Sequence, residues 1–202
     1  MLRRQMVIEF FRDIDDADVR IHGNGFLQAE LPDGKKMHVW NKDPDFPRQA
    51  VNTQIHNHVS SFRSAIIYGK LRNIEYRMKP LDDDIKRAGG RFFDEYEARV
   101  RHGKDTGLHP TGRDFGIDTR RKFDFSVGSV YDFPGTADLF HETIPQTSLL
   151  ITVIERRSEN DPNRNPIIMV PLGQEPDNVF DRYAHQEYAI DLYGQIIDFL
   201  NK

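Results

Sequence analysis

Residues 53–73 read TQIHNHVSSFRSAIIYGKLRN and place His56 and His58 one residue apart, ahead of an apolar, β-branched segment that ends at Gly69. In a strand, alternate side chains share a face, so the two imidazoles would point the same way. Together they could bind one cation if a neighbouring strand supplied a third ligand. The chain has eight histidines, so a His-x-His pair also arises readily by chance. Surface or core-lining histidines are the competing interpretation.

A second stretch, residues 128–145, reads GSVYDFPGTADLFHETIP and contains Gly128, Pro134 and His141. The two stretches together resemble the paired motifs of the cupin superfamily. The first motif is Gly, five residues, His-x-His, three or four residues, Glu, six residues and Gly. The second is Gly, five residues, Pro-x-Gly, two residues and His. The chain departs from this pattern at Ala50, which replaces the leading glycine, and at His141, which lies two residues late.

The most informative departure is Phe62, which stands where the first motif has its glutamate; no carboxylate occurs between His58 and Glu75. The resemblance therefore implies His56, His58 and His141 as the metal ligands, without an acid. This set is similar to that of the thiol dioxygenases among the cupins, which bind ferrous iron. Imidazole nitrogen also accepts zinc, nickel or manganese, so the expected cofactor is a divalent metal, Fe(II) first.

The resemblance implies a mainly β fold, a cupin-like double-stranded β-helix or jelly-roll barrel, formed by residues 1–202 as a single domain. Residues 25–41, with the turn signal PDG, are typical of a hairpin. Further short strands are predicted in FDFSV, SVYDF, DLFHETI, SLLITVIERR and PIIMVPL.

Helices are expected at both ends of the chain, over residues 1–16 and about 178–201, where the apolar residues follow helical spacing. Residues 80–125 are predicted to be an insertion of mixed character. Apolar residues at Ile85, Ala88, Phe92, Tyr96 and Val100 favour a helix, bent or broken at Gly89-Gly90. A glycine-rich loop is expected over residues 102–116.

Composition narrows the possible functions. The chain has no cysteine, which excludes disulfides and thiolate metal ligands, and its net charge is −4 without a long basic stripe. No apolar run approaches the roughly 20 residues that cross a bilayer. We therefore expect a cytoplasmic protein whose partner is a small-molecule substrate, with neither nucleic acid nor membrane as a partner. The resemblance also implies a possible homodimer.

The leading functional hypothesis is a mononuclear non-haem iron oxygenase, similar to thiol dioxygenases, acting on a small molecule. Tyr131 and Arg63 are the candidates for catalytic contact with the substrate; a core tyrosine and a surface charge are the alternatives. A cupin sugar isomerase or epimerase is a second hypothesis. A non-catalytic barrel that binds a small ligand is a third, so the sequence leaves open whether the protein is an enzyme.

Overall fold

The computed structural model describes residues 19–22, 24–31, 33–42, 46, 54–101, 104–158, 164–176 and 185–201. The predicted N-terminal helix lies outside these residues. The described strands are β1 (Val19–His22), β2 (Phe26–Glu30), β3 (Lys36–Asn41), β4 (Phe62–Tyr68), β5 (Lys70–Pro80), β6 (Phe92–Arg101), β7 (Lys104–Ser126), β8 (Val130–Phe133), β9 (Leu139–Pro145), β10 (Leu149–Arg156) and β11 (Ile167–Pro171). The described helices are α2 (Asp83–Ala88) and α3 (Gln186–Asn201). Neither helix combines the length and apolar character that crossing a membrane requires.

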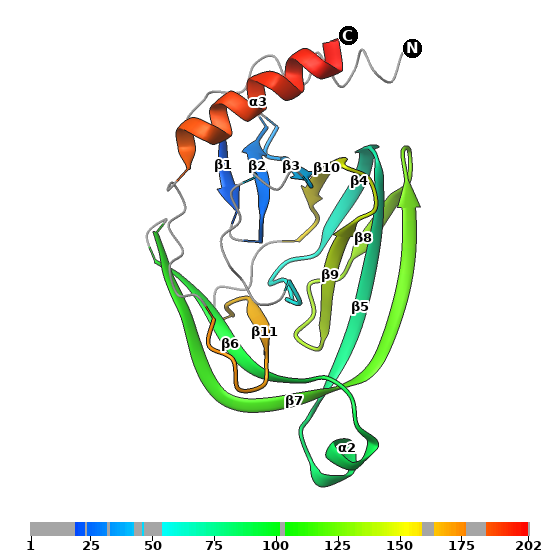
Figure 1. Cartoon of the computed structure of the whole chain (residues 1–202), viewed down its shortest axis with the longest axis vertical. Coiled ribbons are helices and arrows are strands. Elements are labelled where there is room, and N and C mark those ends of the chain that lie inside the picture. Colours follow the sequence, from blue (N-terminus) through cyan, green and yellow to red (C-terminus); the bar gives the residue numbers. More distant parts are fainter. Residues whose placement is uncertain are drawn as a thin grey trace.

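Within the described residues the strands form two antiparallel sheets (Figure 1). The first runs β1-β2-β3-β10-β4-β8 and the second β11-β6-β7-β5-β9. His56 adds to the second sheet, because it bridges His141 on β9 and Ile168 on β11. Eight of these segments form the barrel when they are numbered 1 to 8 along the chain: β3, the His56 segment, β4, β5, β7, β8, β9 and β10. In this numbering the first sheet has the order 1-8-3-6 and the second has the order 2-7-4-5. This is the double Greek key of a jelly roll, so the predicted fold class is confirmed.

Strand alternation gives the N-terminal part of the first sheet two different faces. Met37 and Val39 on β3 point outward and are fully buried, in a core that also contains Leu192 and Ile196 of α3. Lys36 and His38, on the alternate positions, point inward and line a cavity. Figure 1 shows α3 lying across the end of the molecule formed by β1, β2 and β3, with α2 at the opposite end. The helix thus covers the apolar outer face, whereas the inner face carries polar side chains together with the aromatic rings of Phe26 and Trp40.

Gly69 forms the turn between β4 and β5 in a conformation that other residues rarely adopt, with φ +81°. A Cβ atom at this position would lie 2.3 Å from the carbonyl oxygen of Leu149 and 2.5 Å from the hydroxyl of Thr147. Both the backbone angle and the close approach require glycine. The turn places β5 at the centre of the second sheet, between β7 and β9.

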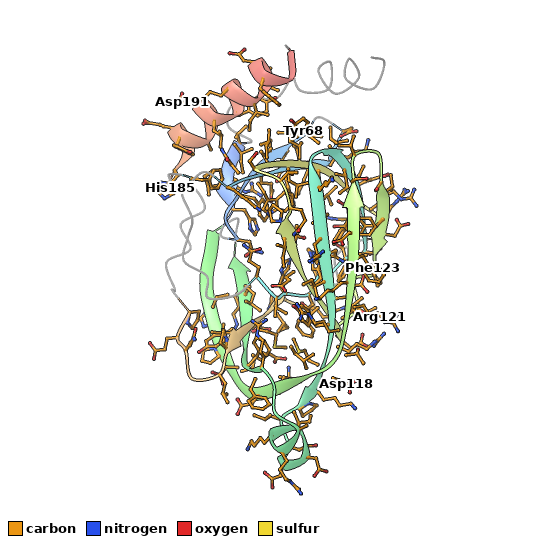
Figure 2. The ribbon with its side chains drawn as sticks, turned by 45° about the vertical axis from the view of Figure 1, so that its right-hand side comes forward. Tyr68, Asp118, Arg121, Phe123, His185 and Asp191 are labelled. Carbon is orange, nitrogen blue, oxygen red and sulfur yellow. The ribbon has the colours of Figure 1, made fainter. Side chains whose placement is uncertain are left out.

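The prediction for residues 80–125 was wrong in its larger part. The helix ends at Ala88, because Gly89 turns the chain with φ +73°, and Phe92 begins a strand. The expected glycine-rich loop belongs mostly to β7, which pairs with both β5 and β6. Register shifts in the β6–β7 pairing absorb the irregular backbone. Figure 1 shows β7 as a long curved strand that runs from β6 to β5. Asp118, Arg121 and Phe123 lie along it in Figure 2.

The C-terminal helix was correctly predicted in type over the part of its range that the structure describes. α3 covers Gln186–Asn201, and the predicted helix covers about residues 178–201. Residues 177–184 lie outside the described residues. Near the other end of α3, the ring of Phe199 makes an edge contact with Tyr68 of β4, with the centroids 5.5 Å apart. Tyr68 lies close to this end of the helix in Figure 2.

Candidate metal centre

Backbone pairing brings the three predicted ligands together. The amide of His56 donates to the carbonyl of His141 at 3.0 Å, and the amide of His141 donates back at 2.8 Å. On the other side, Asn57 donates to Ile167, and Met169 donates to the carbonyl of Ile55. The His56 segment is therefore held between β9 and β11. Because alternate side chains share a face, His58 reaches the same space as His56.

One ring nitrogen from each of His56, His58 and His141 lies within 4.8 Å of the others. The Nε2 atoms of His58 and His141 are 2.9 Å apart. Metal–nitrogen bonds of about 2.1 Å in tetrahedral geometry place the nitrogens about 3.4 Å apart. The widest pair must therefore close by up to roughly 1.4 Å, which rotation of the imidazoles supplies. The three histidines fit a divalent metal.

Two hydrogen bonds orient the imidazoles for this role. Nδ1 of His56 lies 2.7 Å from the carbonyl oxygen of Gln54, and Nδ1 of His141 lies 2.8 Å from Oδ1 of Asn73. Each acceptor fixes the proton on Nδ1 and leaves the Nε2 lone pair available. Outer hydrogen bonds of this kind orient metal-binding histidines and raise their basicity.

The electrostatic environment keeps the three imidazoles neutral. Burial lowers the pKa of His58 and of His141 well below the usual value for histidine, and the neighbouring imidazoles lower it further. Burial also lowers the pKa of His56, although the hydrogen bond to Gln54 opposes this change. Neutral imidazole is the form that binds a metal, so no proton has to be displaced from a cationic ring at neutral pH.

Aromatic side chains surround the imidazoles on one side. Phe62, where the cupin motif has its glutamate, is 4% exposed, and its ring centroid lies 4.7 Å from that of His58. Phe133 stacks on His141 with the centroids 4.3 Å apart. Phe62 thus packs directly against the histidine cluster and contributes no ligand. The described residues around the cluster support a ligand set of imidazoles alone.

The cluster opens into a cavity of about 580 Å³ between the two sheets. This volume lies within the roughly 300–1,000 Å³ typical of small-molecule sites. Tyr131 lines the cavity, and burial raises the pKa of its phenol to about 12, so it stays protonated and able to donate. Its position is compatible with the predicted contact to a ligand. Thr143 lines the same wall.

Arg63 is placed differently from Tyr131. Its guanidinium donates two hydrogen bonds to Asp132 on β8, at 2.8 and 3.1 Å, and 43% of its side chain is exposed. It is absent from the cavity lining, because alternation from the buried Phe62 turns it to the outer face. This is the position of a surface ion pair, the alternative that the sequence left open. In this position the Arg63 side chain does not reach a ligand in the cavity.

Three residues that support the cluster were missed by sequence reasoning. Asn73 orients His141, and Asn57 joins two segments by donating to Ala137 and accepting from the amide of Ile167. Arg164 donates to the carbonyls of Gly135 and His58, at 3.1 and 3.5 Å. Each contact links residues at least 29 positions apart in the chain. No local pattern carries a signal for such contacts.

The strand order and the site together define a cupin-like jelly-roll barrel with three histidines clustered in its interior. No protein-family model matches the chain, and no curated protein matches its sequence. Among solved structures, the CENP-C cupin domain of Drosophila melanogaster is similar, with a TM-score of 0.38 and 7% identity over 77% of this chain and 94% of that one. Drosophila melanogaster CENP-C bound to CAL1 is similar with a TM-score of 0.39 and 7% identity, over 77% of this chain and 90% of that one. A likeness this distant carries no argument, and the fold assignment rests on the strand order.

Proposed function

We propose that His56, His58 and His141 bind one divalent metal, Fe(II) first, and that the protein is an oxygenase acting on a small molecule, similar in chemistry to thiol dioxygenases. The observation that carries the proposal is the convergence of three neutral imidazoles on a cavity of about 580 Å³. Bound ferrous iron would supply the activation of O₂ and of the substrate. Zinc, nickel and manganese are the other metals that this nitrogen set accepts.

The surrounding residues have roles of their own in this proposal. Asn73 and Gln54 hold His141 and His56 in the orientation that directs Nε2 into the cavity. Phe62 and Phe133 exclude water from one side of the cluster, because both are almost fully buried. Tyr131 remains a neutral phenol and donates a hydrogen bond to the substrate. A dry wall beside neutral ligands limits side reactions of a reactive site.

The cavity favours the oxygenase over a sugar isomerase or epimerase. None of the described residues that line it is an aspartate or a glutamate. Isomerisation through proton abstraction needs a general base, a role that a carboxylate commonly fills. The described lining therefore offers no carboxylate for that step.

The test measures metal content and oxygen consumption in one preparation. The full chain is reconstituted with Fe(II) without oxygen, then with Zn(II) in parallel, and the bound metal is counted. We expect one equivalent in the wild type and less than a tenth of that in His56→Ala and His141→Ala. His185→Ala, which changes an exposed histidine outside the cavity, is the matched control. Circular dichroism confirms that each variant is folded.

Oxygen consumption then distinguishes the functions. The oxygenase predicts O₂ uptake by the iron form with a panel of small thiols, and none by the zinc form. If the folded wild type binds no stoichiometric metal, the enzyme proposal is wrong and a metal-free binding barrel remains. Stoichiometric iron without O₂ uptake on any thiol would contradict the dioxygenase chemistry and support a non-catalytic metal-binding barrel.

A further inference from the structure

The cavity is strongly cationic in a chain whose net charge is −4. Among the described residues, four charged side chains line it, and all four are basic: Arg20, Lys36, Arg156 and Arg164. None of the described lining residues is acidic. This contrast with the rest of the chain indicates that the cavity is suited to an anion.

Three of these cations lie together on the inner face of the first sheet. A single carboxylate, that of Glu30, bonds to both Arg20 and Lys36, at 3.3 and 3.2 Å. Burial lowers the pKa of Lys36, and the positive charges of Arg20 and Arg156 lower it further. The carboxylate of Glu30 raises this pKa and offsets part of the change. We call Arg20, Lys36 and Arg156 the cation cluster. The described lining therefore presents these three cations to the cavity and no carboxylate.

A row of polar side chains lies beside the cation cluster. His38 on β3 is in register with Gln28 on β2 and with Thr152 on β10, so the three side chains are adjacent across the sheet. We call these three residues the polar row; all of them line the cavity. Gln28 is 4% exposed and Thr152 1% exposed. Arg20 is in register with Gln28 and so joins the row to the cation cluster.

One polar atom of each residue in the row is buried without a hydrogen-bond partner: Nε2 of Gln28, Nε2 of His38 and Oγ1 of Thr152. Most buried polar groups in folded proteins are paired, so three adjacent exceptions need an explanation. The amide nitrogen of Gln28 is a donor, and the hydroxyl of Thr152 donates as well as accepts. Donors beside excess positive charge match the oxygens of an anion.

We propose that the polar row and the cation cluster form a binding subsite for the carboxylate group of a small organic acid. A carboxylate is negatively charged, which suits a cavity whose described lining has basic side chains and no acidic one. Its two oxygens accept from neutral donors as well as from cations. The subsite stands on the first sheet, whereas the histidine cluster belongs to the His56 segment and β9. The subsite does not depend on metal binding.

The placement also limits the size of the ligand. The subsite and the histidine cluster line the same cavity, and the charge of His58 contributes to the lowered pKa of His38. Facing sheets pack about 10 Å apart. An acid of two to six carbons therefore fits between the sheets, with its carboxylate on the polar row and the remainder toward the histidines.

The test uses metal-free full-length protein, prepared with a chelator that is then removed. Linear mono- and dicarboxylates of two to six carbons are titrated by calorimetry, each beside its neutral amide, with inorganic phosphate as a separate arm. We expect at least one acid to bind and its amide to bind at least tenfold more weakly. Thr152→Val and Arg156→Met should each weaken binding of that acid at least tenfold. Thr119→Val, an exposed change on β7, is the matched control and should leave binding unchanged.

Folding and binding are separable in this design. Thr152→Val preserves shape and removes an unpartnered hydroxyl, so the melting temperature of the ligand-free protein should not fall. The proposal is overturned if no acid of the panel binds, if phosphate alone binds, or if binding is equally strong in Thr152→Val. Metal content is measured on separate samples, so failure of the metal site leaves the outcome of these titrations intact.

Discussion

Nε2 of His58 and Nε2 of His141 lie 2.9 Å apart, although the two residues are 83 positions apart in the chain. Because Nδ1 of His141 carries the proton donated to Asn73, its Nε2 is an acceptor. Without a metal, His58 donates Nε2–H to it. With a metal, both lone pairs face the same ion. The hydrogen bonds that orient the imidazoles should therefore determine how tightly the site binds a metal.

Asn73→Leu tests the support of His141. Asn73 is 1% exposed, and its Oδ1 is the acceptor for His141 Nδ1 at 2.8 Å. Loss of such an outer hydrogen bond lowers metal affinity by about 10- to 100-fold. We expect this loss in Asn73→Leu, measured by competition with a chromophoric chelator.

Asn73→Asp is the matched variant, because it keeps an oxygen acceptor and adds negative charge beside the imidazole. Its metal affinity should equal or exceed that of the wild type. Equal affinities in wild type and Asn73→Leu, with both proteins folded, would show that Asn73 does not orient a metal ligand.

Acid should destabilise the metal-free protein through its buried histidines, and His38 is the one to isolate. Burial lowers the pKa of His38 well below 6.5 in the folded state. Below pH 6.5 the unfolded chain therefore binds a proton at this position that the folded chain does not. The free energy of unfolding falls as pH falls, by up to about 1.4 kcal/mol per pH unit for each such histidine, until the folded pKa is reached.

Urea unfolding at pH 7.5, 6.5 and 5.5 measures this dependence. His38→Gln removes one titrating group, so the loss of stability between pH 6.5 and 5.5 should shrink by up to about 1 kcal/mol relative to wild type. His185→Ala, at an exposed position, should leave the loss unchanged. Parallel curves for wild type and His38→Gln would contradict a neutral His38 in the folded state.

Gly69→Ala should destabilise the barrel strongly. Gly69 has φ +81°, and a Cβ there would lie 2.3 Å from a backbone carbonyl, which has little freedom to move. Strain of this kind costs about 1–3 kcal/mol before the clash is counted, so we expect a loss of at least about 2 kcal/mol. Gly34→Ala has a similar φ of +77° with nothing within 4 Å of the added atom. Comparing the two by urea unfolding separates the clash from the backbone strain; equal losses would contradict the role of the close approach.

The sequence predicted the histidine cluster better than the residues that support it. Strand alternation predicted that His56 and His58 share a face, the resemblance to the cupin motifs added His141, and the three nitrogens do converge. Asn73 was not predicted, since its contact with His141 depends on the pairing of β5 with β9.

The error at β6 has a different physical origin. The apolar residues from Ile85 to Val100 fit a helical period, but Gly89 and Gly90 end the helix at Ala88. Beyond the glycines, pairing with β7 on one side and β11 on the other determines the conformation. Long-range pairing of this kind overrides local periodicity, which is why the second half of the segment is a strand.

Phe62→Glu tests whether Phe62 stands at the position of a metal ligand. The side chain is 4% exposed, with its ring centroid 4.7 Å from that of His58 and 5.3 Å from that of Phe133. In metal-free protein the change removes buried aromatic packing and places a carboxyl in an apolar wall. We expect the free energy of unfolding to fall by at least about 3 kcal/mol.

A metal should recover part of this loss only when the new side chain can bind it. Ligand binding to the folded state stabilises it in proportion to RT ln(1 + [L]/Kd), so a fourth ligand increases the stabilisation by a fixed metal concentration. We therefore expect Zn(II) to raise the melting temperature of Phe62→Glu by more than that of wild type. Phe62→Gln has nearly the same shape without the charge and should gain no more than wild type. If Phe62→Glu and Phe62→Gln respond alike to Zn(II), the side chain at this position does not reach the metal, and the three-histidine site is not a cupin site with its acid replaced.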